Sequence, residues 1–305
     1  MAETTPLTVG FVGLGRMGGS MAARFLAAGY TVYGEEQDRE HARALERDGL
    51  RWCETPRAVA QAADVVFTSI PNDEVLELVA SGQDGIIAGL SAEQVWVDMS
   101  TVSPRASREL AQRVQEAGAH LLDAPVSGSV PQVQAGTLTI MVGGDKDAYA
   151  RVEPLLRELG APTRIGENGQ GLVLKLAINI SLAVQTLAFS EGLLLAEHAG
   201  VDPELALQVM TQSPIGSPML KARAPLFLDQ PDEAWFDVDL MQKDIKLALA
   251  SGSDLDVPLP STAVVAELLS AARGNGYENR DITILLRLLS DLAETRAQRR
   301  LGHAV

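Results

Sequence analysis

The hydrophobic pattern of this chain changes its period once, near Gly169, and this change limits the choice of fold more than any other feature. Residues 7–165 alternate short apolar runs with helical patterns. This alternation predicts a parallel sheet whose strands are joined by crossover helices. After Gly169 the strands stop, and helical periodicity continues over nearly all of the remaining chain. We therefore predict a doubly wound α/β domain, followed through a long interdomain helix by an all-α domain.

The glycine-rich stretch between Gly166 and Gly171 marks the predicted boundary, giving domains 1–166 and 167–305. The expected strands of the first domain cover 7–12, 31–34, 65–70, 95–99, 120–122 and 137–142. Its expected helices cover 17–28, 39–48, 104–117 and 147–159. The second domain has helical patterns over 170–198, 203–212, 217–228, 239–252, 258–273 and 281–296. This helical half is too apolar to stand alone in water, so we expect a homodimer or homotetramer.

Charge and composition exclude several classes of function. The 305 residues carry a net charge of −15, which repels nucleic-acid phosphates and anionic lipid. The apolar run around 172–196 is interrupted by polar residues, so we interpret it as a core helix and expect no membrane partner. Cys53 is the only cysteine, which leaves no internal disulfide and no zinc-type cluster. These features predict a cytoplasmic globular protein with a small-molecule ligand.

A glycine motif directly follows the first apolar run and opens a helix. In Gly13-Leu14-Gly15-Arg16-Met17-Gly18, the first glycine permits a tight turn. Gly15 lets the backbone approach a pyrophosphate, and Gly18 lets helix and strand pack closely. The amino end of the helix adds N–H donors and a positive dipole. Placed in the first strand–helix unit, this motif predicts a Rossmann-type dinucleotide-binding domain.

An acidic residue follows the second expected strand, about 20 residues after the motif. Either Glu35 or Glu36 can bind the adenosine ribose hydroxyls, and we favour Glu36. A carboxylate there repels the extra phosphate of NADP, and the nearest arginine is Arg39. The predicted cofactor is NAD, with NADP less favoured. If these acids only form a solvated loop, the preference stays open.

Two further motifs carry candidate chemistry. The turn Ser127-Gly128-Ser129 is expected to end a strand with hydroxyls and free backbone N–H groups, which suit a carboxylate ligand, although such a segment can also be a plain turn. Lys175 and Asn179 share one face of an otherwise apolar helix. A lysine there either reaches out to solvent or lies in a cleft, where desolvation favours the neutral amine needed for proton transfer. We expect Gly171, one turn earlier, to leave open space above this amine.

Taken together, these motifs resemble the β-hydroxyacid dehydrogenases, which include 3-hydroxyisobutyrate, tartronate semialdehyde, glyoxylate/succinic semialdehyde and 6-phosphogluconate enzymes. The resemblance covers nearly the whole chain. It is carried by Gly13–Gly18, Asp98–Thr101, Asp123–Ser129, Gly169–Asn179 and Lys243-Asp244. It implies a Rossmann domain, a long helix, a helical domain that dimerises, and hydride transfer between a nicotinamide cofactor and a small hydroxyacid or semialdehyde acid.

The resemblance also implies roles for individual residues. Lys175 would be the catalytic acid/base. The residues that would hold the dinucleotide are Gly13, Leu14, Gly15, Arg16, Met17, Gly18, Glu36, Pro71, Thr101 and Lys243. The residues that would bind the substrate are Ser127, Gly128, Ser129, Asn179, Phe236 and Asp244.

Some features depart from the family pattern and keep alternatives open. Many relatives have glycine where Ser129 stands, and Val130–Ala135 differs from their small-residue pattern. The segment from Ser213 to Asp244 looks most like the glyoxylate/succinic semialdehyde and tartronate semialdehyde reductase branch. Imine reductases share the architecture but usually replace the lysine. A phosphosugar substrate is disfavoured because the helical half has no cluster of arginines to bind a phosphate. A non-catalytic dinucleotide-binding protein is the alternative from another class.

Overall fold

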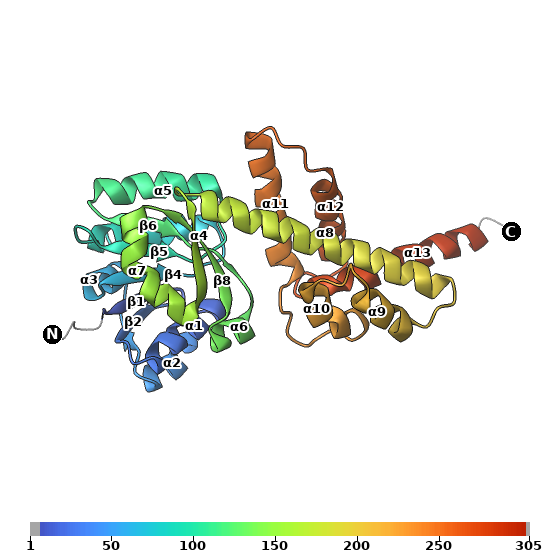
Figure 1. Cartoon of the computed structure of the whole chain (residues 1–305), viewed down its shortest axis with the longest axis horizontal. Coiled ribbons are helices and arrows are strands. Elements are labelled where there is room, and N and C mark those ends of the chain that lie inside the picture. Colours follow the sequence, from blue (N-terminus) through green and yellow to red (C-terminus); the bar gives the residue numbers. More distant parts are fainter. Residues whose placement is uncertain (1–6, 303–305) are drawn as a thin grey trace. The chain divides into compact units, whose positions relative to one another are not determined.

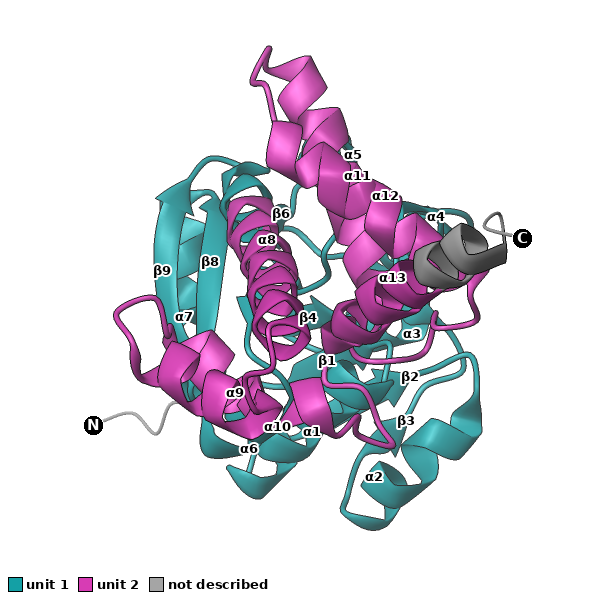
Figure 2. Ribbon diagram, turned by 90° about the vertical axis from the view of Figure 1, so that its right-hand side faces the viewer, with its two compact units in different colours: residues 1–175 teal, residues 176–305 magenta. Residues whose placement is uncertain are grey.

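The computed structural model describes residues 7–302 of the chain, and side chains as far as residue 294. The chain forms two compact units, Met1–Lys175 and Leu176–Val305, which Figure 2 colours separately. The division falls inside one long helix, α8 (Gln170–His198), whereas the sequence pattern placed the boundary after residue 166.

Unit 1 is a sheet with helices on both of its faces (Figure 1). Its strands are β1 (Val9–Val12), β2 (Val32–Glu35), β3 (Arg51–Trp52), β4 (Val65–Thr68), β5 (Val95–Asp98), β6 (His120–Asp123), β7 (Val126–Ser127), β8 (Leu138–Gly144) and β9 (Gly160–Gly166). Its helices are α1 (Arg16–Ala27), η1 (Arg39–Ala42), α2 (Arg43–Arg47), α3 (Pro56–Ala62), α4 (Asp73–Ala80), η2 (Ile86–Gly89), α5 (Pro104–Glu116), α6 (Val130–Ala135) and α7 (Lys146–Leu159). The sequence pattern missed β3, α3, α4, η2, β7, α6 and β9.

The strand order is β3-β2-β1-β4-β5-β6-β8-β7, with β9 beside β8. Strands β1 to β6 run parallel, as predicted, and the order reverses between β1 and β4. The prediction of a parallel sheet is wrong at β8, which runs antiparallel to β6 and β7. The chain turns back before β8 at Gly136, whose φ of 67° lies in the left-handed region that glycine adopts at little cost.

The central strands are buried on both faces, so their side chains alternate between two cores. Phe11 and Phe67 face the core that α1, α6 and α7 cover, and their rings stack at 5.7 Å. Val66 and Trp96 face the opposite core, with α3, α4 and α5. This double layer explains why the strands read as continuous apolar runs.

Unit 2 is helical, as predicted. It contains the rest of α8 followed by α9 (Pro203–Gln212), α10 (Pro218–Leu228), α11 (Val238–Asp254), α12 (Pro260–Gly274), η3 (Ile282–Ile284) and α13 (Leu285–Gly302). Its main core joins Met241 and Ile245 of α11 to Val265 and Leu269 of α12. By length and composition alone, α8 is the one helix of residues 7–302 that could cross a membrane. A buried core helix of a soluble protein passes the same test.

Candidate active site

The glycine motif forms the turn from β1 into α1, where each glycine has a different local requirement. Gly13 has a φ of +87°, and a Cβ there would lie 2.5 Å from the carbonyl oxygen of Ser69. A Cβ on Gly18 would lie 2.0 Å from the carbonyl oxygen of Gly13. At Gly15, the N-cap of α1, a Cβ would meet nothing within 4 Å. The open space at Gly15, beside the amino end of α1, fits the pyrophosphate of a dinucleotide.

The two acids at the end of β2 have different surroundings. Glu36 accepts a hydrogen bond of 2.7 Å from the backbone N–H of Leu14, so its carboxylate is tied to the glycine loop. Glu35 is half-buried, and burial, reinforced by the charge of Glu36, raises the pKa of Glu35 to about 7. Cys53 lies nearby, and burial followed by the charges of Glu35 and Glu54 raises the pKa of its thiol. Glu36 is therefore the carboxylate attached to the predicted dinucleotide loop.

Pro71 and Thr101 follow the carboxyl ends of β4 and β5. In the sheet β4 lies beside β1, and β5 lies beside β4. Ser100 accepts a hydrogen bond of 2.9 Å from the backbone N–H of Ile70, joining the two loops. Asp98, at the end of β5, accepts a bond of 2.7 Å from the hydroxyl of Thr68. The structure thus places Pro71, Thr101 and the glycine loop at one edge of the sheet, where doubly wound proteins bind their ligands.

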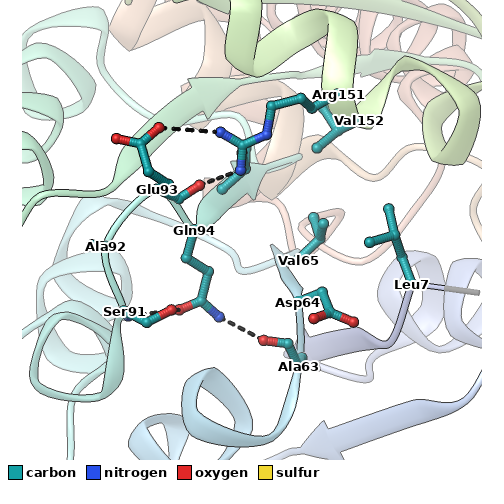
Figure 3. Close-up of a pocket in the computed structure, with 11 residues that line it drawn as sticks. Leu7, Ala63, Asp64, Val65, Ser91, Ala92, Glu93, Gln94, Arg151 and Val152 are labelled. Atoms are coloured by element: carbon teal, nitrogen blue, oxygen red, sulfur yellow. Dashed lines mark hydrogen bonds and ion pairs between the residues drawn. The ribbon is translucent and has the colours of Figure 1, made fainter. Parts of the chain in front are cut away.

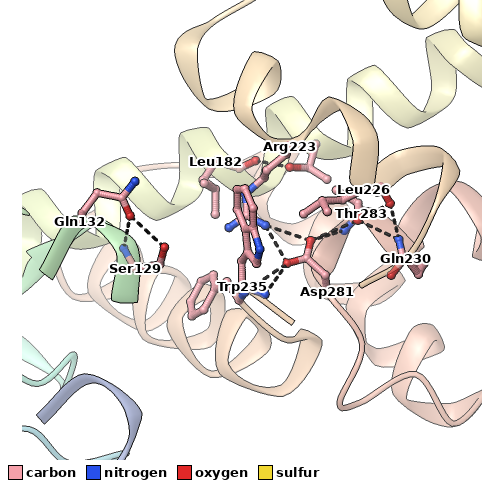
Figure 4. Close-up of polar contacts among 11 residues, drawn as sticks. Ser129, Gln132, Leu182, Arg223, Leu226, Gln230, Trp235, Asp281 and Thr283 are labelled. Carbon is pink, nitrogen blue, oxygen red and sulfur yellow. Dashed lines mark hydrogen bonds and ion pairs between the residues drawn. The ribbon is translucent and has the colours of Figure 1, made fainter. Parts of the chain in front are cut away.

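The turn Ser127-Gly128-Ser129 links β7 to α6. Gly128 has a φ of +135°, a conformation that side chains disfavour. Both the N–H and the hydroxyl of Ser129 donate to Oε1 of Gln132, each at 2.9 Å (Figure 4). The prediction that this turn leaves its N–H groups free is therefore wrong for Ser129. Serine followed three residues later by glutamine is a capping-box pattern, a signal that the sequence already contains.

Asp123, at the end of β6, holds the first turn of α8. Its fully buried carboxylate accepts the N–H of Gly169 at 2.7 Å and that of Leu172 at 3.1 Å. Burial raises the pKa of Asp123, and these two backbone hydrogen bonds oppose that change. Sequence reasoning quoted Asp123 only as part of a motif and did not assign it this role.

Gly171 has a different role from the predicted one. A Cβ on Gly171 would lie 2.4 Å from the carbonyl oxygen of Met141 and 2.8 Å from Oδ2 of Asp123. The prediction of open space beside Gly171 is therefore wrong. Instead, the missing side chain lets the first turn of α8 pack directly against β8 and Asp123.

Lys175 and Asn179 lie one turn apart on α8, as predicted. Lys175 is 9% exposed and Asn179 is 3% exposed. This burial argues against a lysine that reaches out to solvent. Within unit 2, the amide nitrogen of Asn179 donates to Oδ2 of Asp244 at 2.6 Å, and Oδ1 of Asp244 pairs with Nζ of Lys243 at 3.0 Å. Asn179, from the motif on α8, is thus brought together with Lys243 and Asp244, from the motif in the last third of the chain.

Phe236 lies just before α11, the helix that carries Lys243 and Asp244. Its half-buried ring packs against the main core of unit 2. Its N–H donates to Oδ2 of Asp281 at 3.1 Å. Sequence reasoning found no role for Asp281, which lies 45 residues further along the chain.

A pocket of about 410 Å³ opens in unit 1 at the amino ends of β4 and β5 (Figure 3). Among its lining residues, Arg151 pairs with Glu93 at 3.5 Å, and Gln94 donates to the carbonyl oxygen of Ala63 at 2.7 Å. Dinucleotides bind at the carboxyl ends of the strands in doubly wound sheets, so this pocket is not the predicted site. Among the described residues, no group of three or more His, Cys, Asp or Glu side chains is placed to hold a metal.

Comparison with known proteins decides the family. A family model described as the NAD binding domain of 6-phosphogluconate dehydrogenase matches residues 8–170. A second, described as NAD-binding of NADP-dependent 3-hydroxyisobutyrate dehydrogenase, matches residues 169–289. The chain is 36% identical to 2-hydroxy-3-oxopropionate reductase of Escherichia coli (strain K12), covering 94% of this chain and 98% of the relative. The chain belongs to the β-hydroxyacid dehydrogenase family.

This dehydrogenase is also similar to 2-(hydroxymethyl)glutarate dehydrogenase of Eubacterium barkeri, with 34% identity over 92% of this chain and 94% of the relative. A solved 3-hydroxyisobutyrate dehydrogenase of Mycobacterium tuberculosis, described with L-serine, superposes with a TM-score of 0.84 and 27% identity, covering 93% of this chain and 99% of that chain. An imine reductase from Pseudomonas sp., 24% identical with a TM-score of 0.61, shares the fold alone. The protein is therefore an NAD(P)-dependent oxidoreductase that acts on CH–OH groups of a small molecule, and the predictions of fold and enzyme class are confirmed.

Proposed function

We propose that this dehydrogenase oxidises a short β-hydroxyacid, or reduces the corresponding semialdehyde acid, with Lys175 as the proton-transfer residue and NAD as the preferred cofactor. The observation that carries the proposal is the buried pair Lys175 and Asn179 on one face of α8. Residues four apart in a helix lie on one face, so these two polar side chains can act on the same ligand.

Proton transfer is the role of Lys175. In the direction of oxidation, Nζ of Lys175 takes the hydroxyl proton of the substrate as the neutral amine, and in reduction it returns that proton. When bound, the nicotinamide ring supplies the acceptor or donor of the hydride. Asn179, whose orientation is fixed by its hydrogen bond to Asp244, orients the substrate. The rigid first turn of α8, held by Asp123, supports a fixed position for the amine.

The substrate carboxylate binds to the turn from Ser127 to Ser129. A carboxylate oxygen can replace Oε1 of Gln132 as the acceptor for the N–H and hydroxyl of Ser129, because the two acceptors need the same donors. In unit 2, we propose Phe236 and Asp244 as further substrate-binding residues. A substrate of about three to five carbons is expected, since the carboxylate and the hydroxyl-bearing carbon must be bound together.

Two features support NAD over NADP. The carboxylate of Glu36 is fixed on the glycine loop, where it repels a ribose phosphate. Arg39, the nearest arginine, donates to Glu46 at 2.8 Å, and its guanidinium lies 4.7 Å from the centre of the Trp52 ring. These contacts hold Arg39 without a phosphate. Initial rates with the two cofactors test the preference, and a strong NADP preference would contradict it.

Substrate identity is tested by following NAD(P)H absorbance over a panel of C2–C5 hydroxyacids and aldehyde acids. We expect activity with at least one β-hydroxyacid or its semialdehyde. Tight NAD binding with no turnover across the panel would favour a non-catalytic dinucleotide-binding protein. Turnover of cyclic imines alone would favour imine reduction.

We also propose a homodimer or homotetramer in the cytoplasm. Large apolar side chains of unit 2 lie exposed, namely Leu195, Leu205, Val209 and Ile215. Exposed apolar patches favour association with another chain. Size-exclusion chromatography with light scattering should give a mass of two or four chains, whereas a monomer at micromolar concentration would contradict the proposal.

A further inference from the structure

Unit 2 contains a buried ion pair that the proposed chemistry does not use. Nη1 of Arg223, on α10, lies 2.9 Å from Oδ1 and 2.8 Å from Oδ2 of Asp281. Arg223 is 8% exposed and Asp281 is fully buried. A buried ion pair stabilises a fold little compared with apolar residues of the same volume. The role of Arg223 and Asp281 therefore depends on the segments that they hold in position.

Asp281 collects hydrogen bonds from three parts of the chain. Besides Arg223, its Oδ2 accepts the N–H of Trp235 at 3.0 Å and that of Phe236 at 3.1 Å. Its Oδ1 accepts the N–H and the hydroxyl of Thr283. Figure 4 shows the carboxylate between Arg223, the Trp235 segment and Thr283. The carboxylate thus fixes the backbone on which the Phe236 ring is mounted.

The same segment sets the start of α11. Backbone hydrogen bonds join Ile282 to Phe236 at 3.1 Å and Val238 to Arg280 at 3.0 Å. Asp237 then caps α11 by accepting the N–H of Leu240 at 2.8 Å. Lys243 and Asp244 follow on this helix. Fixing residues 235–237 therefore fixes both Phe236 and the helix that carries two further site residues.

The side chain of Trp235, next to Phe236 in the chain, also contacts Arg223. The guanidinium of Arg223 lies 5.6 Å from the centre of the Trp235 ring, within the range of a cation–π contact. Trp235 nevertheless stays 42% exposed. Arg223 thus contacts both the carboxylate that holds the backbone of this segment and the indole at its surface.

We propose that Arg223 and Asp281 are a positioning pair for the hydroxyacid site: they hold Trp235 and Phe236, and through them the start of α11, in the conformation that binds the substrate. The inference rests on the proposed function. It predicts that loss of the pair weakens substrate binding and turnover, while dinucleotide binding to the glycine loop of unit 1 is retained.

The test compares Arg223→Met and the milder Arg223→Lys with the wild type. Lysine keeps the charge but loses the planar group that stacks on Trp235. We expect Arg223→Met to lower kcat/KM for the hydroxyacid by about tenfold to a hundredfold, with a smaller loss for Arg223→Lys and an unchanged Kd for NADH. Hydrogen exchange of a peptide spanning residues 234–240 should be faster in Arg223→Met.

Arg273→Met is the matched control. Arg273, on α12, pairs with Asp239 of α11 and also donates to Oε1 of Gln242 at 2.9 Å. The ion pair is about half exposed, and no bond described for residues 7–294 joins Arg273 to Asp281. We expect its kinetics to match the wild type.

Unchanged kinetics and exchange in a folded Arg223→Met variant would overturn the inference. A parallel loss of NADH binding would also overturn it, because that pattern indicates general destabilisation. If Arg223→Met does not fold, Arg223→Lys decides by the same two measurements. Failure of the proposed function gives a different result, namely a wild-type protein that turns over no hydroxyacid.

Discussion

The two glycines Gly15 and Gly18 should respond in opposite ways to the same methyl group. A Cβ at Gly15 meets nothing within 4 Å, and the backbone there (φ −62°, ψ −166°) accepts alanine. Gly15→Ala should therefore change the free energy of unfolding by less than about 1 kcal/mol, the scale of an N-cap change. A Cβ at Gly18 lies 2.0 Å from a backbone oxygen, so Gly18→Ala should lose about 1–3 kcal/mol from overpacking.

For dinucleotide binding, Gly15→Ala should have the larger effect, the reverse of the order expected for stability. If the open space at Gly15 is where the pyrophosphate approaches, the overpacking cost appears only on binding. A penalty of about 1–3 kcal/mol raises Kd by about 5- to 150-fold. Urea unfolding without cofactor and a fluorescence titration with NADH measure the two quantities. A Gly15→Ala variant that binds NADH like the wild type would refute this placement of the pyrophosphate.

Two further predictions concern stability. Gly171→Ala should lower the free energy of unfolding by about 1–3 kcal/mol, because its methyl group overlaps Met141 and Asp123; an unchanged urea midpoint would contradict the close packing of α8. The folded chain holds the proton of Glu35 up to about pH 7, above the ordinary pKa of 4.5, so this group favours folding at low pH and loses that contribution as pH rises from 4.5 to 7. Glu35→Gln should therefore gain in Tm over the wild type between pH 5 and pH 8, and parallel Tm profiles of the two proteins would count against this prediction.

The sequence predicted best where a feature depends on neighbours along the chain. Gly13, Gly15 and Gly18 could be interpreted because the turn, the strand and the helix are contiguous. Lys175 and Asn179 could be paired because helical periodicity alone places them on one face. The open choice between Glu35 and Glu36 needed one more fact, namely which carboxylate reaches the Leu14 N–H.

The errors concern contacts between distant segments. Gly171 was assigned open space because nothing in its local sequence shows that β8 and Asp123 pack against it. The antiparallel course of β8 depends on the turn at Gly136, which local periodicity does not reveal. Arg223 and Asp281 lie 58 residues apart, and no local pattern predicts that two opposite charges will meet in a core.

The central claim, proton transfer by Lys175, is tested most directly by the kinetics of Lys175→Ala. General acid–base catalysis contributes about 10²–10⁴-fold to a rate. We expect kcat for the hydroxyacid found in the panel to fall by at least about a hundredfold, the lower end of this range. The Kd for NADH should stay within about twofold of the wild type, well below the tenfold change that a loss of 1.4 kcal/mol produces. A variant that keeps its kcat and loses only cofactor affinity would contradict the assignment.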